Sequence, residues 1–478
     1  MNFWNPVLCL IITVGFVGCE TTRPTCSPPF SPQEKNDPTL VKSVEIFFDV
    51  SASMEGFVSP QRGEKSSYID LVGSIPEQLR RINTEKVSYY SFGKKIQDNF
   101  SLAEVTQPRS YKCDKNVQIK THDKKVKSKP EDRPDCNNQE SRIDKVLEKF
   151  DTKDNSLQII FTDLFLNNTE VLGAQADALR RALEKSLGKS RSFALLGVRS
   201  SFHGKIYDLP SGEKYEKATS RPFYMLIFGS SEPLSRLVEN ISFLISNTLP
   251  SDAFHLAVFT KELKKTNTPL MLSSVVRSGS SATEKEIFSA TPLVTGIDQE
   301  VPQFRLVTPL KDSPIQVTLP LSSIQLKNGL PIGNFTVHSD VWWWVPGGKS
   351  SACKEHWVKY ENPLQKRNPS IFEIYEKGSM FSLKIDLTFI NTLPPRRTYA
   401  VSTKVKASIL DIKVSDIMPW VSKWSFSAET EETLVRNGPQ FFPTLNLGQF
   451  VSVLANALQA QSKTILVLEH NAIFRIDR

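Results

Sequence analysis

VEIFFDVSASM, from Val44 to Met54, is an apolar run that ends on Asp49 and then places serines at alternate positions, Ser51 and Ser53. Such a run predicts a buried strand followed by a polar turn. Carboxylate and hydroxyl oxygens that leave one strand end together suit a hard cation such as Mg²⁺, Ca²⁺ or Mn²⁺. Asp and Ser also favour turns on their own account, so an ordinary strand-to-helix loop is the alternative interpretation.

A second apolar run, SLQIIFTDLF, also ends on an acid, Asp163, and is followed by a stretch typical of a helix. Between the two runs, NNQESRIDKVLEKF places Ser141 just before a short amphipathic helix. Strands that end on carboxylates and lead into helices bring those acids to one edge of an open parallel α/β sheet. The two acids and Ser141 are therefore expected to lie near each other.

Alternation of strands and helices continues over residues 42–260, interrupted by a charged insert at about 101–140. This alternation predicts an α/β domain with a doubly wound, mostly parallel sheet. Residues 265–478 differ, because short runs with period-two alternation are separated by Pro, Gly, Asn and Ser clusters. They predict an all-β, sandwich-like domain that includes a helix near the C-terminal end, at roughly 446–460.

The Asp-x-Ser-x-Ser pattern, a later hydroxyl before a helix and an acid after a further strand resemble the metal-ion-dependent adhesion site (MIDAS) of the von Willebrand factor type A (vWA) family, whose fold is Rossmann-like. Two positions depart from the family pattern, because Ser141 replaces the usual Thr and Leu164 replaces a Gly. A hairpin-like segment, HGKIYDLPSGEKY, also stands where the family has a helix. Carried over position by position, the resemblance implies these metal ligands: Asp49, Ser51, Ser53, Ser141 and Asp163.

In the vWA family the ion keeps one coordination position for an acidic side chain of a protein partner. The resemblance thus implies metal-dependent protein binding rather than an enzyme. One alternative is a metal-dependent hydrolase, such as a phosphatase, with Asp49 as ligand or nucleophile. However, no Lys, His or carboxylate cluster accompanies the motif, and the six histidines show no metal-site or triad spacing. The other alternative is a structural subunit of an envelope assembly with a vestigial metal site.

Residues 1–19, MNFWNPVLCLIITVGFVGC, have an apolar core that is short for a membrane span and typical of a secretory signal. The run Phe16-Val17-Gly18-Cys19 resembles the lipobox of bacterial lipoproteins. This implies a signal peptide at 1–18, a lipid on Cys19 and a location in the cell envelope, on its periplasmic or extracellular face. A simple cleaved signal or an uncleaved anchor is the alternative. Residues 19–41, rich in Pro, Ser and Thr, predict an extended tether.

The six cysteines are too few for a disulfide-built scaffold in a chain of 478 residues. In an exported protein, Cys113 and Cys136 are the natural disulfide pair, because they bracket the charged insert and would close its loop. The formal charge of +8 is modest and usually reflects solvated surface, with anionic lipid or an acidic partner as the functional alternative. No nucleic-acid-binding motif accompanies the charge, so nucleic acid is not an expected partner.

A tryptophan triplet, Trp342, Trp343 and Trp344, lies within the predicted β domain. In a strand, Trp342 and Trp344 share one face and Trp343 takes the other. Core packing is the favoured interpretation, because aromatic side chains dominate protein cores. If Trp342 and Trp344 are instead exposed, they form a possible binding surface for protein or glycan.

Overall fold

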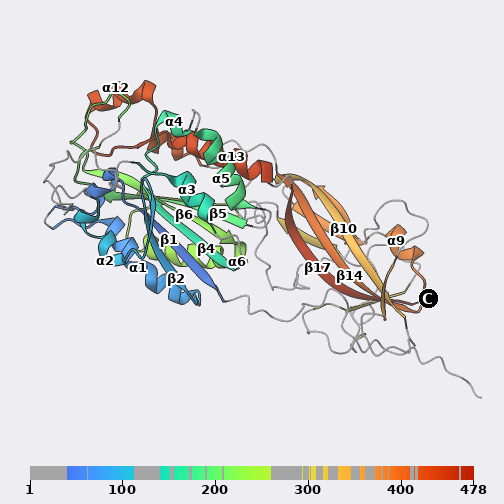
Figure 1. Ribbon diagram of the computed structural model, residues 1–478. Coiled ribbons are helices and arrows are strands. Elements are labelled where there is room, and N and C mark those ends of the chain that lie inside the picture. Colours follow the sequence, from blue (N-terminus) through green and yellow to red (C-terminus); the bar gives the residue numbers. More distant parts are fainter. Residues whose placement is uncertain are drawn as a thin grey trace, which may run out of the picture.

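The computed structural model describes residues 40–61, 63–111, 140–150, 155–171, 175–188, 191–206, 209–259, 293, 301, 303–307, 316–320, 332–345, 356–360, 372–377, 380–385, 387–409, 414, 418–461 and 464–477. The signal peptide, Cys19 and the Cys113–Cys136 pair predicted from the sequence lie outside these residues. The described chain forms an α/β unit and an elongated β unit (Figure 1). No helix within the described ranges is long and apolar enough to cross a membrane.

The α/β unit is built on a seven-stranded sheet with the strand order β3-β2-β1-β4-β6-β5-β7. Its strands are β1 (Ser43–Asp49), β2 (Val87–Phe92), β3 (Ile96–Asp98), β4 (Ser156–Thr162), β5 (Arg191–Ser201), β6 (Ser220–Ser230) and β7 (Phe254–Phe259). Strand β1 is parallel to both of its neighbours, β2 and β4, whereas the other neighbouring pairs in this described sheet are antiparallel. The predicted α/β class is confirmed, but the sheet is mixed rather than mostly parallel.

The connection between β5 and β6 explains the mixed sheet. Instead of a crossover helix, the chain makes a hairpin-like loop in which Ile206 and Tyr215 form an isolated antiparallel bridge. A chain that turns back without a crossover must pair antiparallel to the strand that it has just left. Strand β6 therefore enters the sheet between β4 and β5 and runs antiparallel to both.

Helices cover both faces of this sheet (Figure 1). Helices α1 (Ser67–Arg81) and α6 (Ser231–Ser246) pack on one face, and α3 (Ile143–Lys149) and α5 (Ala176–Leu187) pack on the other. Successive side chains of a strand point to opposite faces, so Phe48 joins the first core and Phe47 the second. The remaining elements before β7 are short: 3₁₀ helices at Ala52–Phe57 and Pro108–Tyr111, α2 (Leu102–Val105) and α4 (Asn168–Val171).

The β unit contains two sheets, with strand orders β11-β10-β14-β17-β8 and β12-β13-β9. Its elements are β8 (Gln303–Val307), β9 (Gln316–Pro320), β10 (Ile332–Trp344), β11 (Trp357–Lys359), β12 (Phe372–Lys377), β13 (Met380–Ile385), α9 (Leu387–Thr392), β14 (Arg397–Ile409) and β17 (Thr464–Asp477). The long strands β10, β14 and β17 pair antiparallel along most of their length. They form the curved sheet that extends away from the α/β unit in Figure 1.

The chain returns from β14 to the α/β unit before it adds its last strand. This C-terminal segment comprises α11 (Val421–Trp424), β15 (Ser425–Phe426), α12 (Ala428–Asn437), β16 (Thr444–Leu445) and α13 (Leu447–Gln461). Helix α13 packs against α5 and shares one hydrophobic core with α3 and α5. Directly after α13, the chain enters the β unit again as β17 (Figure 1). Residues 418–461 thus belong to the α/β unit by their contacts.

Candidate metal centre

The candidate site lies where β1 and β4 end side by side. These strands are parallel and in register, with Phe48 opposite Phe161, so the residues that follow them meet at one edge of the sheet. In each case the acid at the strand end also shapes the turn. The backbone N–H of Ser51 donates to Asp49 Oδ1 at 2.9 Å, and that of Phe165 donates to Asp163 Oδ1 at 3.2 Å.

Asp49 is the centre of a compact group of oxygen atoms. Its Oδ2 accepts hydrogen bonds from Ser141 Oγ and from Thr162 Oγ1, each at 2.7 Å. The hydroxyl oxygens of Ser51 and Ser53 lie 3.0 Å apart on the turn after β1. The fold therefore brings Ser141, which lies 92 positions from Asp49 in the sequence, next to the strand-end motif. Four of the five ligands implied by the vWA resemblance belong to this group.

Asp163, the fifth of these residues, forms an ion pair with an arginine that the sequence analysis did not single out. Its Oδ2 lies 3.2 Å from Nη2 of Arg221, and the side chains are 1% and 0% exposed. Nη1 of Arg221 also donates to the backbone carbonyl of Ser53 at 3.4 Å. The guanidinium thus connects the loop after β4 to the loop after β1.

Burial and nearby charge together shift the pKa values of Asp49 and Arg221. Burial, followed by the nearby charge of Asp163, raises the pKa of Asp49 from 3.8 to about 6, and hydrogen bonds from Ser141 and Ser51 oppose the rise. Burial lowers the pKa of Arg221, an effect that its pairing with Asp163 opposes. Arg221 pairs with Asp163, whereas the described partners of Asp49 are two hydroxyls and a backbone N–H, so an ionised Asp49 has no counter-charge among them. A cation at Asp49 would provide it.

The donor set fits a hard divalent cation. Neighbouring oxygen ligands of Mg²⁺ at about 2.1 Å from the metal lie about 3.0 Å apart in an octahedron. The Ser51 and Ser53 hydroxyl oxygens have this separation, 3.0 Å. The described residues contain no group of three or more His, Cys, Asp or Glu that could hold a metal. A cation here would therefore depend on serine hydroxyls as much as on Asp49.

Two residues of the site, Thr162 and Arg221, were not identified as site residues from the sequence. Thr162 directly precedes Asp163, and its side chain accepts a hydrogen bond from the Leu164 N–H at 3.1 Å while donating to Asp49. Arg221 stands at the head of RPFYMLIFG, an otherwise apolar strand that is buried from Arg221 to Gly229. A charged side chain within such a run indicates a buried ion pair, because a fully buried charge requires a partner of opposite charge.

Leu164 occupies the position at which the vWA family has Gly. Its backbone φ is +50°, in the left-handed region that favours glycine, and its side chain is completely buried. The chain therefore keeps the backbone turn that a Gly would allow and places an apolar side chain in the core. The departure from the family pattern is accommodated by local backbone strain.

The C-terminal segment contacts the same loop. Thr444 Oγ1 donates to the Asp163 carbonyl at 3.3 Å, and it lies 3.0 Å from the Tyr224 hydroxyl. Asn446 Nδ2 donates to the Leu166 carbonyl at 3.0 Å and to Asn168 Oδ1 at 2.8 Å. The residues just before α13 thus fix the loop that carries Asp163.

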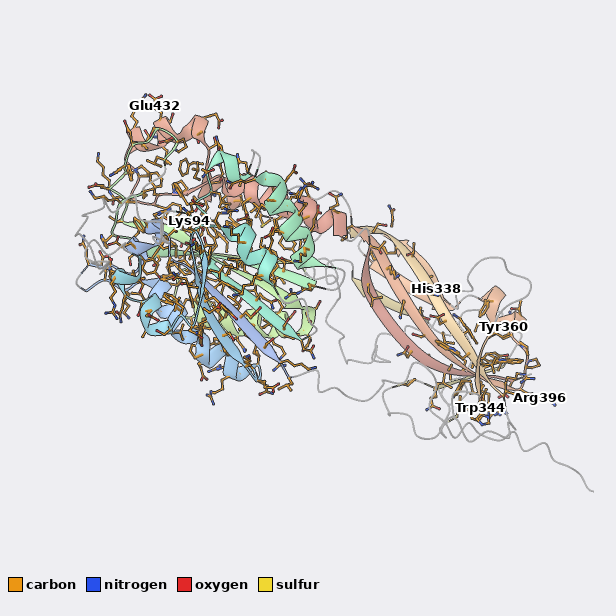
Figure 2. All side chains as sticks on the ribbon, in the orientation of Figure 1. Lys94, His338, Trp344, Tyr360, Arg396 and Glu432 are labelled. Carbon is orange, nitrogen blue, oxygen red and sulfur yellow. The ribbon has the colours of Figure 1, made fainter. Side chains whose placement is uncertain are left out.

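The tryptophan triplet lies elsewhere. Trp344 is only 8% exposed and stacks with His356 and packs edge-on against Trp357. Trp342 packs against the same cluster, and Trp343 lies under the guanidinium of Arg397 at 4.2 Å. Figure 2 shows Trp344 near Arg396, at the end of the β unit away from the α/β unit. Trp344 is thus a core side chain and cannot contribute to an exposed tryptophan pair.

The arrangement of strand-end acids, hydroxyls and arginine must be interpreted from its own geometry. Comparison of the chain with protein families, curated proteins and solved structures gave no match.

Proposed function

We propose that the protein binds a protein partner through a divalent cation held at a vWA-like site. The observation that carries the proposal is the convergence of oxygen atoms from Asp49, Ser51, Ser53 and Ser141 at the carboxyl ends of parallel strands β1 and β4. This edge is where open α/β sheets place their binding sites. Mg²⁺, Ca²⁺ and Mn²⁺ all match an oxygen-only donor set.

The choice of ligands suits the capture of an acidic side chain. Asp49 supplies a carboxylate, while Ser51, Ser53 and Ser141 supply neutral oxygens. A cation that is held by few formal charges keeps enough positive charge to attract a further carboxylate from outside the protein. The partner that this chemistry would recognise is a protein with an accessible Asp or Glu.

The proposed location is the cell envelope. A lipid on Cys19 and the Pro/Ser/Thr-rich tether would hold the α/β unit near a membrane surface, where it could meet a protein partner. One chain would then combine two functions, membrane attachment at its N-terminal end and partner binding at the Asp49 edge.

A second candidate, a structural subunit with a vestigial metal site, is favoured by one observation. Arg221 already places a positive charge against Asp163, in a fully buried position. Because the arginine already neutralises one carboxylate, less negative charge remains for a metal ion to compensate than at a site of unpaired carboxylates. The experiment must therefore distinguish metal binding from a metal-free ion pair.

Calorimetric titration of the purified protein with Mg²⁺, Mn²⁺ and Ca²⁺ tests the proposal. Wild type should bind one ion, and Asp49→Ala should abolish both this binding and capture of a carboxylate-bearing peptide. The matched control is Asp98→Ala, which removes an exposed acid on the edge strand β3, where Asp98 pairs with Lys149 of α3. This variant should bind the ion and the peptide as wild type does. Absence of binding by wild type, or normal binding by Asp49→Ala, would contradict the proposal.

The same proteins distinguish the hydrolase alternative. Wild type would be assayed for turnover of a generic phosphoester in the presence of a divalent cation. Turnover that is lost in Asp49→Ala and kept in Asp98→Ala would favour the hydrolase function over partner binding. We expect no such turnover, because the described residues around Asp49 contribute hydroxyls and one arginine that is itself enclosed by the core.

A further inference from the structure

We propose that Arg221 is a resident cation of the candidate metal centre. In this arrangement Arg221 holds Asp163 permanently, so an added divalent ion is bound by Asp49 and the serine hydroxyls without Asp163. The inference deepens the proposed function and rests on it for the identity of the added ion. It differs from the ligand set implied by the vWA resemblance, which includes Asp163.

The first support is the position of the guanidinium between two loops. Nη2 of Arg221 lies 3.2 Å from Asp163 Oδ2, and Nη1 donates to the Ser53 carbonyl at 3.4 Å. The loops after β1 and β4 are the two loops that an ion bound between Asp49 and Asp163 would connect. Arg221 makes this connection from a third strand, β6, without a metal.

The second support is the enclosure of Arg221 by aromatic rings. The guanidinium carbon lies 4.8 Å from the ring centre of Phe202 and 5.0 Å from that of Phe165. Both contacts favour a cation at this point. Phe202 in turn packs closely over Gly56, where an added Cβ would lie 2.3 Å from the ring. The arginine has no open path to solvent through these groups, and its side chain is 0% exposed.

The third support is the division of the acid's oxygen atoms. Asp163 Oδ1 accepts from the Phe165 N–H, and Oδ2 faces Arg221, so both oxygens already have a partner. At Asp49 the bonds to Oδ2 come from the hydroxyls of Ser141 and Thr162, which can rotate away and leave the lone pairs of this oxygen to a cation. A divalent ion can therefore be coordinated by Asp49 without breaking an ion pair. Coordination by Asp163 Oδ2 would compete with Arg221.

Arg221 therefore limits the negative charge that a metal meets. The Asp163–Arg221 pair carries no net charge, and among the described residues of the site Asp49 is the carboxylate that remains for the ion. Removal of the guanidinium would release a second carboxylate and remove a repelling charge. In a buried site both changes strengthen cation binding, by roughly tenfold or more.

The test compares Arg221→Gln, Arg221→Lys and wild type in the full-length protein, using Mn²⁺ as the probe. Arg221→Gln should bind Mn²⁺ at least about tenfold more tightly and show a larger rise in melting temperature with Mn²⁺. Arg221→Lys keeps the charge and should resemble wild type. Arg191→Gln is the matched control, because Arg191 is a buried arginine at the opposite edge of the sheet, where β5 begins. It should lose stability without a change in Mn²⁺ affinity.

The outcomes separate this inference from the proposed function. If Arg221→Gln and wild type bind Mn²⁺ equally, Arg221 is not a resident cation, although the proposed function stands. If Arg221→Gln binds Mn²⁺ and wild type does not, the resident cation is supported and the proposed function fails. Absence of binding by all variants overturns both.

The double variant Asp163→Asn/Arg221→Gln keeps the inference testable if Arg221→Gln does not fold. It removes both charges of the buried pair, so neither charge is left unpaired and the net charge near Asp49 does not change. Because the inference excludes Asp163 from the ligands, the double variant should bind Mn²⁺ with an affinity within a few-fold of wild type. A loss of tenfold or more would make Asp163 a ligand and overturn the inference.

Discussion

Arg221 on β6 and Asp163 after β4 form an ion pair with both side chains shielded from solvent, at a Nη2–Oδ2 distance of 3.2 Å. Desolvation of two charges is expensive, and their mutual attraction and the few contacts around them must offset it. Arg221 Nε has no hydrogen-bond partner among the described residues, so the guanidinium is not fully satisfied. The pair is therefore better explained by a role at the site than by a gain in stability.

Loss of one partner of this pair should strongly destabilise the protein. Asp163→Ala leaves Arg221 buried without its counter-charge, and we expect the free energy of unfolding to fall by about 3–5 kcal/mol. Urea denaturation monitored by circular dichroism measures this change. Glu77→Gln, which breaks exposed pairs with Arg80 and Arg81 on α1, is the control and should have little effect. A small effect of Asp163→Ala would mean that the pair opens readily to water.

The raised pKa of Asp49 predicts an unusual pH dependence of stability. Burial and Asp163 raise this pKa from 3.8 to about 6 in the folded protein. Between these pH values the folded state holds a proton that the unfolded chain has released. The stabilising contribution of this group is thus fully present below pH 3.8 and is lost as the pH rises through about 6.

Asp49→Asn cannot ionise and should escape this loss. In the presence of EDTA, its free energy of unfolding should exceed that of wild type at pH 8 by up to about 3 kcal/mol. The difference should shrink toward zero near pH 4. Urea denaturation across this pH range provides the measurement. Parallel pH profiles for the two proteins would mean that Asp49 titrates as an ordinary carboxyl group.

Leu164 combines backbone strain with a buried side chain, and two substitutions separate these effects. Leu164→Gly relieves the strain of φ +50° but removes a completely buried side chain. Leu166→Gly removes a buried leucine from the same loop at a position without positive φ. Both should destabilise, Leu164→Gly by about 1–2 kcal/mol less, because its strain is released. Equal losses in urea denaturation would show that the Leu164 backbone is unstrained.

The contacts of the C-terminal segment should order the loop that carries Asp163. Thr444→Val keeps the shape of a buried side chain but removes its hydrogen bonds to the Asp163 carbonyl and the Tyr224 hydroxyl. We expect a loss of about 1–3 kcal/mol and faster amide hydrogen exchange over residues 163–166. Thr248→Val, at the exposed end of α6, is the control. Unchanged exchange in Thr444→Val would mean that the loop is ordered by Arg221 alone.

Membrane attachment is expected to depend on Cys19. Cys19→Ala should release the protein from the membrane fraction or block its maturation, because the residue that would carry the lipid is lost. Cell fractionation and mass spectrometry of the intact protein provide the measurement, with Cys26→Ala as the control. Identical fractionation and an unlipidated mass for wild type would contradict the lipid anchor.

Several features of the site could be predicted because they are local. The apolar runs that became β1 and β4 each end on an acid, and the helix after Ser141 has a recognisable apolar face. Parallel neighbours bring their carboxyl ends together, so Asp49 and Asp163 were expected at one edge. The hairpin-like segment HGKIYDLPSGEKY was a local sign of the antiparallel pairing of β6 with β5. The place of β6 between β4 and β5 could not be predicted in the same way, because strand pairing uses backbone hydrogen bonds that carry little sequence information.

The sequence by itself determined the strand-end acids, the serines beside them and the α/β class, since apolar periodicity and turn chemistry act over a few residues. Only the tertiary structure decided that β6 enters between β4 and β5 and so delivers Arg221 to Asp163, 58 positions away. A buried charge must find its partner in space, and the choice among distant acids depends on packing and topology rather than on sequence spacing. For this reason the fold, and not the spacing of residues in the sequence, places Arg221 at the candidate metal centre.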